Sequence, residues 1–277
     1  MENGEIAEKG YKMLYKLMAV DIDGTLLDSN GNLTNETIKA IRLGVEKGLI
    51  FTICTGRSIQ GVKKLNDMIG LDLPYITYNG AMVVKGKSRE ILHEQKMSYS
   101  DAKTVYELGE KNNTTIVVWN DNKLYVNKMN EMVFKYGEIN DTKAILIHNI
   151  DEVVKNGATK ILWYDEARVI EKFEKEVGKY LGCSINYHTS RPIFLEFVDV
   201  NASKAIALER LRAYFGIKQS EIIAVGDGAN DISMIEYAGL GIAMDNASQV
   251  VKQKADYITL SNDEDGVAHV IYKFILG

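Results

Sequence analysis

The chain reads LMAVDIDGT at residues 17–25 and IIAVGDGAND at residues 222–231. In each stretch an apolar run typical of a buried strand leads directly into acidic residues. Carboxylates placed at the carboxyl ends of strands lie where open α/β sheets bind their ligands. The two stretches therefore predict an α/β fold with an acidic site at the edge of its sheet.

If the two strands are neighbours, as many as four carboxylates converge on one crevice: Asp21, Asp23, Asp227 and Asp231. Unit charges ~4 Å apart repel by ~1 kcal/mol in water and by ~4 kcal/mol at a partly buried site, so the cluster needs protons or a cation. Oxygen ligands favour a hard cation, and we expect Mg²⁺. No Cys or His pair lies close in sequence to suggest zinc.

The composition sets limits on the class of protein. With 277 residues, 46% hydrophobic and 26% charged, the chain is typical of a globular protein of about two domains. A net charge of −5 argues against a nucleic-acid surface. No run of about 18 apolar residues occurs, so we expect no membrane span.

The cysteines and the first residues bear on the compartment. Only Cys54 and Cys183 occur, as expected for reduced thiols in the cytoplasm, and we expect Cys54 to belong to the core rather than to act as a nucleophile. Residues 1–13 are polar and lack the apolar stretch of a signal peptide, and no role is assigned to them. We therefore expect a cytoplasmic protein.

The alternation of elements predicts two domains. Strands and helices alternate up to residue 84 and again after residue 199, which predicts a Rossmann-like parallel sheet with helices on both faces, formed by residues 14–84 and 199–277. Residues 85–198 differ, with short strands that alternate polar and apolar residues, as in a sheet with one face packed and one open. We interpret this segment as an inserted α+β domain. The strands expected in the sheet of the first domain cover residues 17–20, 49–54, 75–78, 222–225 and 240–244, and those in the insert cover residues 115–119, 124–126, 159–164 and 193–197.

Thr55 and Gly56 follow a buried strand and precede a helix that Ser58 can cap. A hydroxyl and backbone N–H groups in this position can hold phosphate oxygens. Taken alone, Thr-Gly-Arg is also a common turn. The position after the strand favours a phosphate site.

Lys204 falls in the first turn of a helix that Asn201 or Ser203 can cap. A cation there opposes the helix dipole at a cost of ~0.3–1 kcal/mol. A phosphate held nearby would explain the placement, although exposed lysines often occupy such positions without a function.

Taken together, these motifs resemble the haloacid dehalogenase superfamily of aspartyl phosphohydrolases, and within it the Cof-type, sugar-phosphatase-like branch. The resemblance covers nearly the whole chain after the first dozen or so residues. It rests on four motifs in order and on one further signature: DIDGT at residues 21–25, CTGR at 54–57, SK at 203–204, GDGAND at 226–231, and NGA at 79–81.

The resemblance implies that Asp21 is a nucleophile that attacks the phosphorus of a monoester and forms an aspartyl-phosphate. Asp23, two residues on, can lie near the leaving oxygen and suits a general acid and later a general base. The resemblance also implies that Mg²⁺ is bound by the carboxylates of Asp21 and Asp227 and the backbone carbonyl of Asp23. Asp231 would support the metal or its waters, although it could also cap the next helix.

Other residues receive more general roles from the resemblance. Asn230 would contact the phosphate or the edge of the site, or simply cap the helix, and Asn79 would contact the substrate or the inserted segment or simply form a turn. The insert, residues 85–198, occupies the position of the family's α/β caps, which close over the phosphate site. Candidates for contact with the leaving group, unless they are ordinary surface residues, are Arg57, His188 and Arg191.

We therefore expect a Mg²⁺-dependent phosphatase that acts on a small phosphorylated metabolite, such as a sugar phosphate or a phosphorylated cofactor or intermediate. The alternatives are a phosphomutase of the same fold and a phosphate-sensing binding module. Asp23 and the large insert argue against the binding module. Dinucleotide binding is excluded because Gly226 and Gly228 lack a third glycine and are interleaved with acidic residues.

Overall fold

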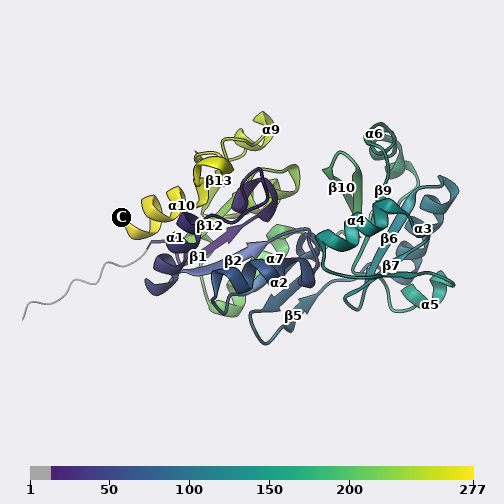
Figure 1. Cartoon of the computed structure of the whole chain (residues 1–277), viewed down its shortest axis with the longest axis horizontal. Coiled ribbons are helices and arrows are strands. Elements are labelled where there is room, and N and C mark those ends of the chain that lie inside the picture. Colours follow the sequence, from purple (N-terminus) through teal and green to yellow (C-terminus); the bar gives the residue numbers. More distant parts are fainter. Residues whose placement is uncertain (1–13) are drawn as a thin grey trace, which may run out of the picture.

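The computed structural model describes residues 14–277 and places them in two lobes, each built around one sheet (Figure 1). Residues 1–13, which the sequence predicts to lack a signal peptide, lie outside the described residues. In the described part of the chain no helix is both long and apolar enough to cross a membrane.

The first sheet has eight strands, and their order confirms the Rossmann-like prediction. Strands β14 to β3 in this order run parallel, and β4 and β5 add an antiparallel edge. In spatial order the strands are β14 (Tyr257–Ile258), β13 (Leu240–Ala243), β12 (Ile222–Gly226), β1 (Leu17–Val20), β2 (Ile50–Cys54), β3 (Tyr75–Thr77), β4 (Met82–Lys85) and β5 (Glu90–Glu94).

Helices cover both faces of this sheet because successive strand residues point to opposite sides. On one side Met18, Val20 and Phe51 pack against α1, α2 and α10. On the other side Leu17, Ala19 and Cys54 pack against α7 and α8, so the prediction that Cys54 is a core residue is confirmed. The helices of this lobe are α1 (Asn35–Glu46), α2 (Ile59–Ile69), α7 (Lys204–Phe215), α8 (Ile232–Tyr237), α9 (Gln249–Lys252) and α10 (Gly266–Ile271).

The second sheet has six strands. In spatial order they are β10 (Ile185–Arg191), β11 (Phe194–Asp199), β9 (Lys160–Tyr164), β6 (Thr115–Asn120), β7 (Lys123–Val126) and β8 (Ala144–Leu146). The helices of this lobe are α3 (Tyr99–Lys111), α4 (Glu131–Ile139), α5 (Ile150–Val154) and α6 (Ala167–Glu176).

The prediction that one face of this sheet is open is wrong. Every residue of the central strands β6, β9 and β11 is buried. Helices α3, α5 and α6 cover one face, and α4 covers part of the other through Val133 and Tyr136. The polar residues that produced the alternation, Lys160 and Glu196, lie on this second face and are paired with each other, 3.0 Å apart. The alternation of polar and apolar residues in these strands thus arises from a buried ion pair and not from a solvent-exposed face.

The junction between the lobes falls later than residue 84. Strand β5 pairs with β4, so residues 85–94 continue the first sheet. The second sheet and its helices begin after this hairpin and end with β11 at Asp199.

The pairing of β1 with β12 positions the site. The strands are parallel, with Val20 opposite Val225, so the residues that follow them emerge side by side. The two acidic stretches therefore meet at one edge of the sheet, as their sequences predict.

Candidate active site

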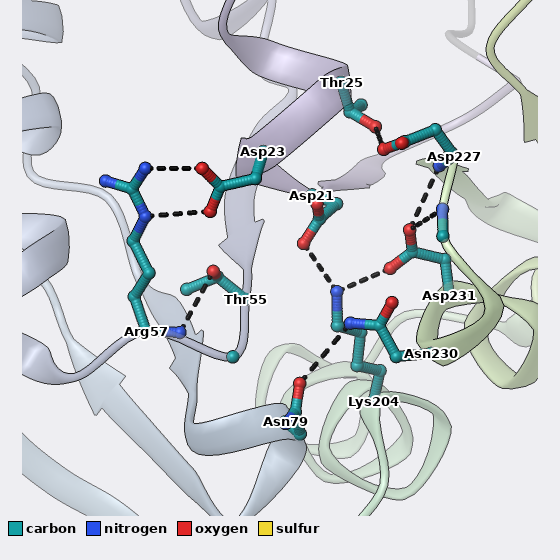
Figure 2. A network of polar contacts seen from close by, with 12 residues as sticks. Asp21, Asp23, Thr25, Thr55, Arg57, Asn79, Lys204, Asp227, Asn230 and Asp231 are labelled. Carbon is teal, nitrogen blue, oxygen red and sulfur yellow. Dashed lines mark hydrogen bonds and ion pairs between the residues drawn. The ribbon is translucent and has the colours of Figure 1, made fainter. Parts of the chain in front are cut away.

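Three of the four predicted carboxylates come together at the ends of β1 and β12 (Figure 2). One oxygen from each of Asp21, Asp227 and Asp231 lies within 4.8 Å of the others. Asp21 and Asp231 are buried, and Asp227 is half-buried. The fourth carboxylate, Asp23, turns toward Arg57 and is not part of this close group, but it lines the same pocket as Asp21 and Asp227.

Lys204 lies between two of these carboxylates. It is the first residue of α7, with Ser203 as the helix cap, and its side chain is only 1% exposed. Its ammonium donates to Asp21 Oδ1 at 2.6 Å and to Asp231 Oδ1 at 2.5 Å. These carboxylates offset the unfavourable position in the helix dipole, which the sequence could attribute only to a phosphate.

The cluster holds more negative than positive charge. Burial, followed by the charge of Asp231, raises the pKa of Asp21 to about 8 although Lys204 opposes the shift. Burial also raises the pKa of Asp227 to about 6. Burial lowers the pKa of Lys204, but Asp21 and Asp231 outweigh it and hold the pKa above its usual value. Three carboxylates and one ammonium thus leave a net negative charge that a cation or a proton can balance.

The loops around the cluster are tightly fitted. Thr25 Oγ1 donates to Asp227 Oδ1 at 2.7 Å. Gly24 has φ +83°, and a Cβ there would collide with the Asp227 carboxylate. Asp231 Oδ2 accepts from the backbone N–H groups of Asp227 at 3.0 Å and Gly228 at 2.9 Å. Its side chain makes no cap bond to α8, so it orders the preceding loop rather than capping that helix.

Asp23 is held by two arginines, one from each lobe. Arg57 Nε and Nη2 donate to the two Asp23 oxygens at 2.9 and 2.7 Å, and Arg191 Nη2, from β10, donates to Oδ1 at 3.0 Å. Burial raises the pKa of Asp23, but Arg57 and then Arg191 outweigh it and hold the pKa below its usual value. Neither arginine is an isolated surface residue.

Thr55 and Gly56 lie beside the cluster and line the same pocket as Asp21 and Asp227. The backbone N–H of Arg57 donates to Thr55 Oγ1 at 3.2 Å, which leaves the hydroxyl hydrogen of Thr55 able to donate. A Cβ at residue 56 would lie 2.7 Å from Asn79 Oδ1, so only glycine fits without displacing Asn79. The local geometry accounts for the Thr-Gly pair.

Asn79 joins the two lobes. It is buried, with φ +57°, and its side-chain amide donates to Glu196 of β11. Asn230 Nδ2 donates to Asn79 Oδ1 at 3.4 Å and lines the pocket. Gly80 has φ +95°, and a Cβ there would collide with the backbone carbonyl of Ser203. This turn therefore contacts both the second sheet and the start of α7.

Sequence reasoning missed the buried pair Lys160 and Glu196, which also lines the pocket. Lys160 Nζ donates to the Gly56 carbonyl at 2.8 Å, and Ser190 Oγ donates to Glu196 Oε1 at 2.9 Å. A charged residue within each of two largely apolar stretches, Lys160 in β9 and Glu196 in β11, was the signal that could have revealed them.

His188, a candidate for contact with the leaving group, lies farther back than Arg57 and Arg191. Its Nε2 is 3.7 Å from Glu196 Oε2, and burial lowers its pKa. It is not among the residues that line the pocket.

Comparisons with known proteins show which proteins this chain is similar to. The model of the haloacid dehalogenase-like hydrolase family matches residues 18–271. The putative phosphatase YxeH of Bacillus subtilis is 34% identical over 268 residues, which cover 95% of this chain and 99% of that protein. The 5-amino-6-(5-phospho-D-ribitylamino)uracil phosphatase YcsE of Bacillus subtilis is 32% identical over 267 residues, which cover 94% and 96%. The structure of the HAD subclass IIB sugar phosphatase BT4131 is similar with a TM-score of 0.82 at 29% identity and covers 94% of this chain and 98% of its own.

Proposed function

Because this chain belongs to the haloacid dehalogenase-like hydrolases, in their Cof-type branch, and is a phosphoric monoester hydrolase, we propose that it releases phosphate from a small phosphorylated metabolite through an aspartyl-phosphate on Asp21. The observation that carries the proposal is the position of Asp21. This buried carboxylate directly follows β1, contacts Lys204 and lines the pocket that Thr55 and Gly56 also line.

In the proposed reaction a carboxylate oxygen of Asp21 attacks phosphorus, and the bond from phosphorus to the leaving oxygen breaks. Asp23 gives its proton to that oxygen. Water then attacks the phosphorus of the aspartyl-phosphate, Asp23 takes the water proton, and phosphate leaves with Asp21 restored.

Asp23 suits the role of general acid and base because it lines the same pocket as Asp21. Arg57 and Arg191 keep it ionised, which is the state that the second step requires. For the first step it has to carry a proton, so the proposal requires these guanidiniums to loosen from it when substrate binds.

The residues present fit a hard divalent cation. Asp21, Asp227 and Asp231 supply only oxygen donors within a short distance, and they outnumber the positive charges beside them. We propose Mg²⁺, held by Asp21, Asp227 and the backbone carbonyl of Asp23, with Asp231 acting on the metal through water. When bound, Mg²⁺ would offset phosphate charge that otherwise repels Asp21.

The phosphate would be held by the groups around the cluster. Thr55 Oγ1 and the backbone around Gly56 supply donors, Lys204 supplies a charge, and Asn230 supplies an amide. The second lobe, residues 85–198 with the boundary shift described above, would act as a cap that excludes water and contacts the leaving group. Arg191, Asn79 and Glu196 support this role because they join the lobes at the pocket.

The names of the relatives support a class of substrate. YcsE is named for a phosphorylated ribitylamino compound and BT4131 for sugar phosphates. A small phosphorylated sugar, polyol or related intermediate is therefore our proposal for this chain.

The test is phosphate release from a panel of sugar phosphates, nucleotides, flavin mononucleotide and pyridoxal phosphate, with and without Mg²⁺. We expect metal-dependent release that falls by about a thousandfold or more in Asp21→Asn, because the nucleophile is lost. Asp67→Asn, at an exposed site on α2, is the matched control and should release phosphate at the wild-type rate. Release that survives in Asp21→Asn would overturn the proposal, and so would no release from any compound. Interconversion of sugar phosphates without release would favour a phosphomutase.

A further inference from the structure

The pocket has two ends of different charge. At the inner end, Asp21 and Asp227 line the pocket, and behind them the buried Lys204 ammonium pairs with Asp21 and Asp231. At the outer end, two guanidiniums share the single carboxylate of Asp23. The outer end therefore carries an excess of positive charge, opposite in sign to the inner end.

Lys160, which also lines the pocket, does not add to the positive charge at the outer end. Its ammonium lies 3.0 Å from Glu196 Oε1 and donates to the Gly56 carbonyl at 2.8 Å. Its charge is neutralised inside the protein, so the excess at the outer end comes from Arg57 and Arg191 alone.

Both guanidiniums keep donors that no other side chain uses. Among residues 14–277, Arg191 makes one side-chain hydrogen bond, through Nη2, although its guanidinium has five N–H groups. Arg57 uses Nε and Nη2 and has no partner for Nη1 within the same part of the chain. Both residues line the pocket.

Arg191 is also held in position. Its guanidinium carbon lies 5.9 Å from the centre of the Phe194 ring, within the range of a cation–π contact. The side chain is 42% exposed, so its free N–H groups can reach a ligand that enters the pocket. An arginine fork fits a carboxylate or a phosphate with two parallel hydrogen bonds.

The cavity itself is small, with a volume of about 110 Å³. Pockets for drug-sized ligands have ~300–1,000 Å³. A compact leaving group therefore suits this site, and little space separates the phosphate end from the two guanidiniums.

We propose that Arg57 and Arg191 recognise a second anionic group, a carboxylate or a second phosphate, on the leaving-group side of the substrate. The preferred substrates are then small phosphomonoesters that carry this additional charge. The proposal rests on the phosphatase function proposed above and narrows its substrate class. The competing explanation is that both arginines serve only to orient Asp23.

The test compares substrates that differ in one group. 3-Phosphoglycerate and glycerol 3-phosphate differ in a carboxylate against a hydroxymethyl group, and fructose 1,6-bisphosphate and fructose 1-phosphate differ in a second phosphate. We expect kcat/KM to be about tenfold or more higher for the anionic member of at least one pair, because a charge-assisted bidentate bond is lost in the other. The pair that shows the preference identifies the anion.

Arg191→Gln should reduce this preference to about twofold or less, mainly through a higher KM for the anionic member. Arg168→Gln removes the same charge from a side chain that is 84% exposed on α6 and should leave the preference unchanged. No preference in the wild type would overturn the proposal. Equal losses for both members in Arg191→Gln would also overturn it, because the arginine would then act only through Asp23.

Calorimetric binding of the same pairs to Asp21→Asn in the presence of Mg²⁺ separates the two proposals. Turnover of all four compounds without any preference would leave the phosphatase standing and remove the second-anion site. Absence of turnover, together with tighter binding of the anionic member that Arg191→Gln abolishes, would remove the phosphatase and support the site. Equal binding of both members and no turnover would overturn both.

Discussion

The ammonium of Lys204 lies 2.6 Å from Asp21 and 2.5 Å from Asp231, and so it joins the start of α7 to the ends of β1 and β12. All three side chains are more than nine-tenths buried. A buried charge that loses its partner destabilises a protein far more than a surface pair does. This triad is therefore both a part of the proposed site and a fixed contact between three segments of the first lobe.

Lys204→Met is expected to lower the free energy of unfolding of the metal-free protein by ~3–5 kcal/mol at neutral pH, because it leaves Asp21 and Asp231 buried without a cation. Urea unfolding measures this change. Lys175→Met, which breaks an exposed pair on α6, is the control and should cost less than ~1 kcal/mol. Equal losses in the two variants would show that the triad contributes no more than a surface ion pair.

The stability of the metal-free protein should depend on pH. The pKa of Asp21 is raised from 3.8 to about 8 and that of Asp227 from 3.8 to about 6. Between about pH 4 and pH 8 these two carboxyl groups therefore bind more protons in the folded protein than in the unfolded chain, so their contribution to stability falls as pH rises through this range. His188, whose pKa burial lowers, acts in the opposite direction within part of the range. The lowered pKa values of Asp23 and Glu196 act below this range, where stability is lost as the pH falls.

Mg²⁺ should reverse this loss. Mg²⁺ binds the ionised carboxylates, so the increase in Tm on its addition should be larger at about pH 8 than at about pH 5. Metal at ~100 times its Kd adds ~2.7 kcal/mol to the free energy of unfolding. Thermal unfolding with and without Mg²⁺ at the two pH values measures the effect. A shift of equal size at both values, or one that persists in Asp227→Asn, would contradict a metal site at these residues.

The pair formed by Lys160 and Glu196 makes a separate prediction for the second lobe. Lys160→Met leaves Glu196 buried without its cation and should cost ~3–5 kcal/mol, whereas the double variant Lys160→Met with Glu196→Leu should recover much of this loss. Chemical denaturation of both variants tests it. Lys135→Met, from an exposed pair on α4, is the control. A double variant less stable than Lys160→Met would show that Asn79 and Ser190 depend on the Glu196 carboxylate more than the ion pair does.

The sequence allowed the sheet and the acidic cluster to be predicted because both depend on local patterns. Apolar runs end at Val20 and Val225, the pairing of β1 with β12 follows from the parallel topology, and the carboxylates come directly after these strands. The direction of Asp23 could not be predicted because Arg191, which helps to hold it, lies 168 residues away. The position of Asp23 in its motif predicts where its side chain begins, but not which residues bind it.

The second lobe was harder to predict for the same physical reason. Lys160 and Glu196 lie on strands that are buried on both faces, and their polar character is explained only by the pair they form and by contacts with Gly56 and Asn79 of the other lobe. Helix α4 covers part of that face, and its contacts with the strands join residues that are distant in sequence. Strand patterns alone therefore suggested an exposed face where the lobes meet.

Gly24→Ala should strongly reduce activity while Gly31→Ala should not. Both glycines have positive φ, +83° and +79°, so each alanine carries a similar backbone strain of ~1–2 kcal/mol. At residue 31 nothing lies within 4 Å of the added Cβ, whereas at residue 24 it meets the carboxylate of Asp227. The collision has to move Asp227 away from Thr25 and from the cluster, so we expect phosphate release to fall by about a hundredfold and the Mg²⁺ concentration for half-maximal activity to rise. Titration of activity with Mg²⁺ in both variants, at equal folded fraction by circular dichroism, makes the comparison. Similar losses in the two variants would show that backbone strain, and not the fit of Asp227, is the reason for a glycine at residue 24.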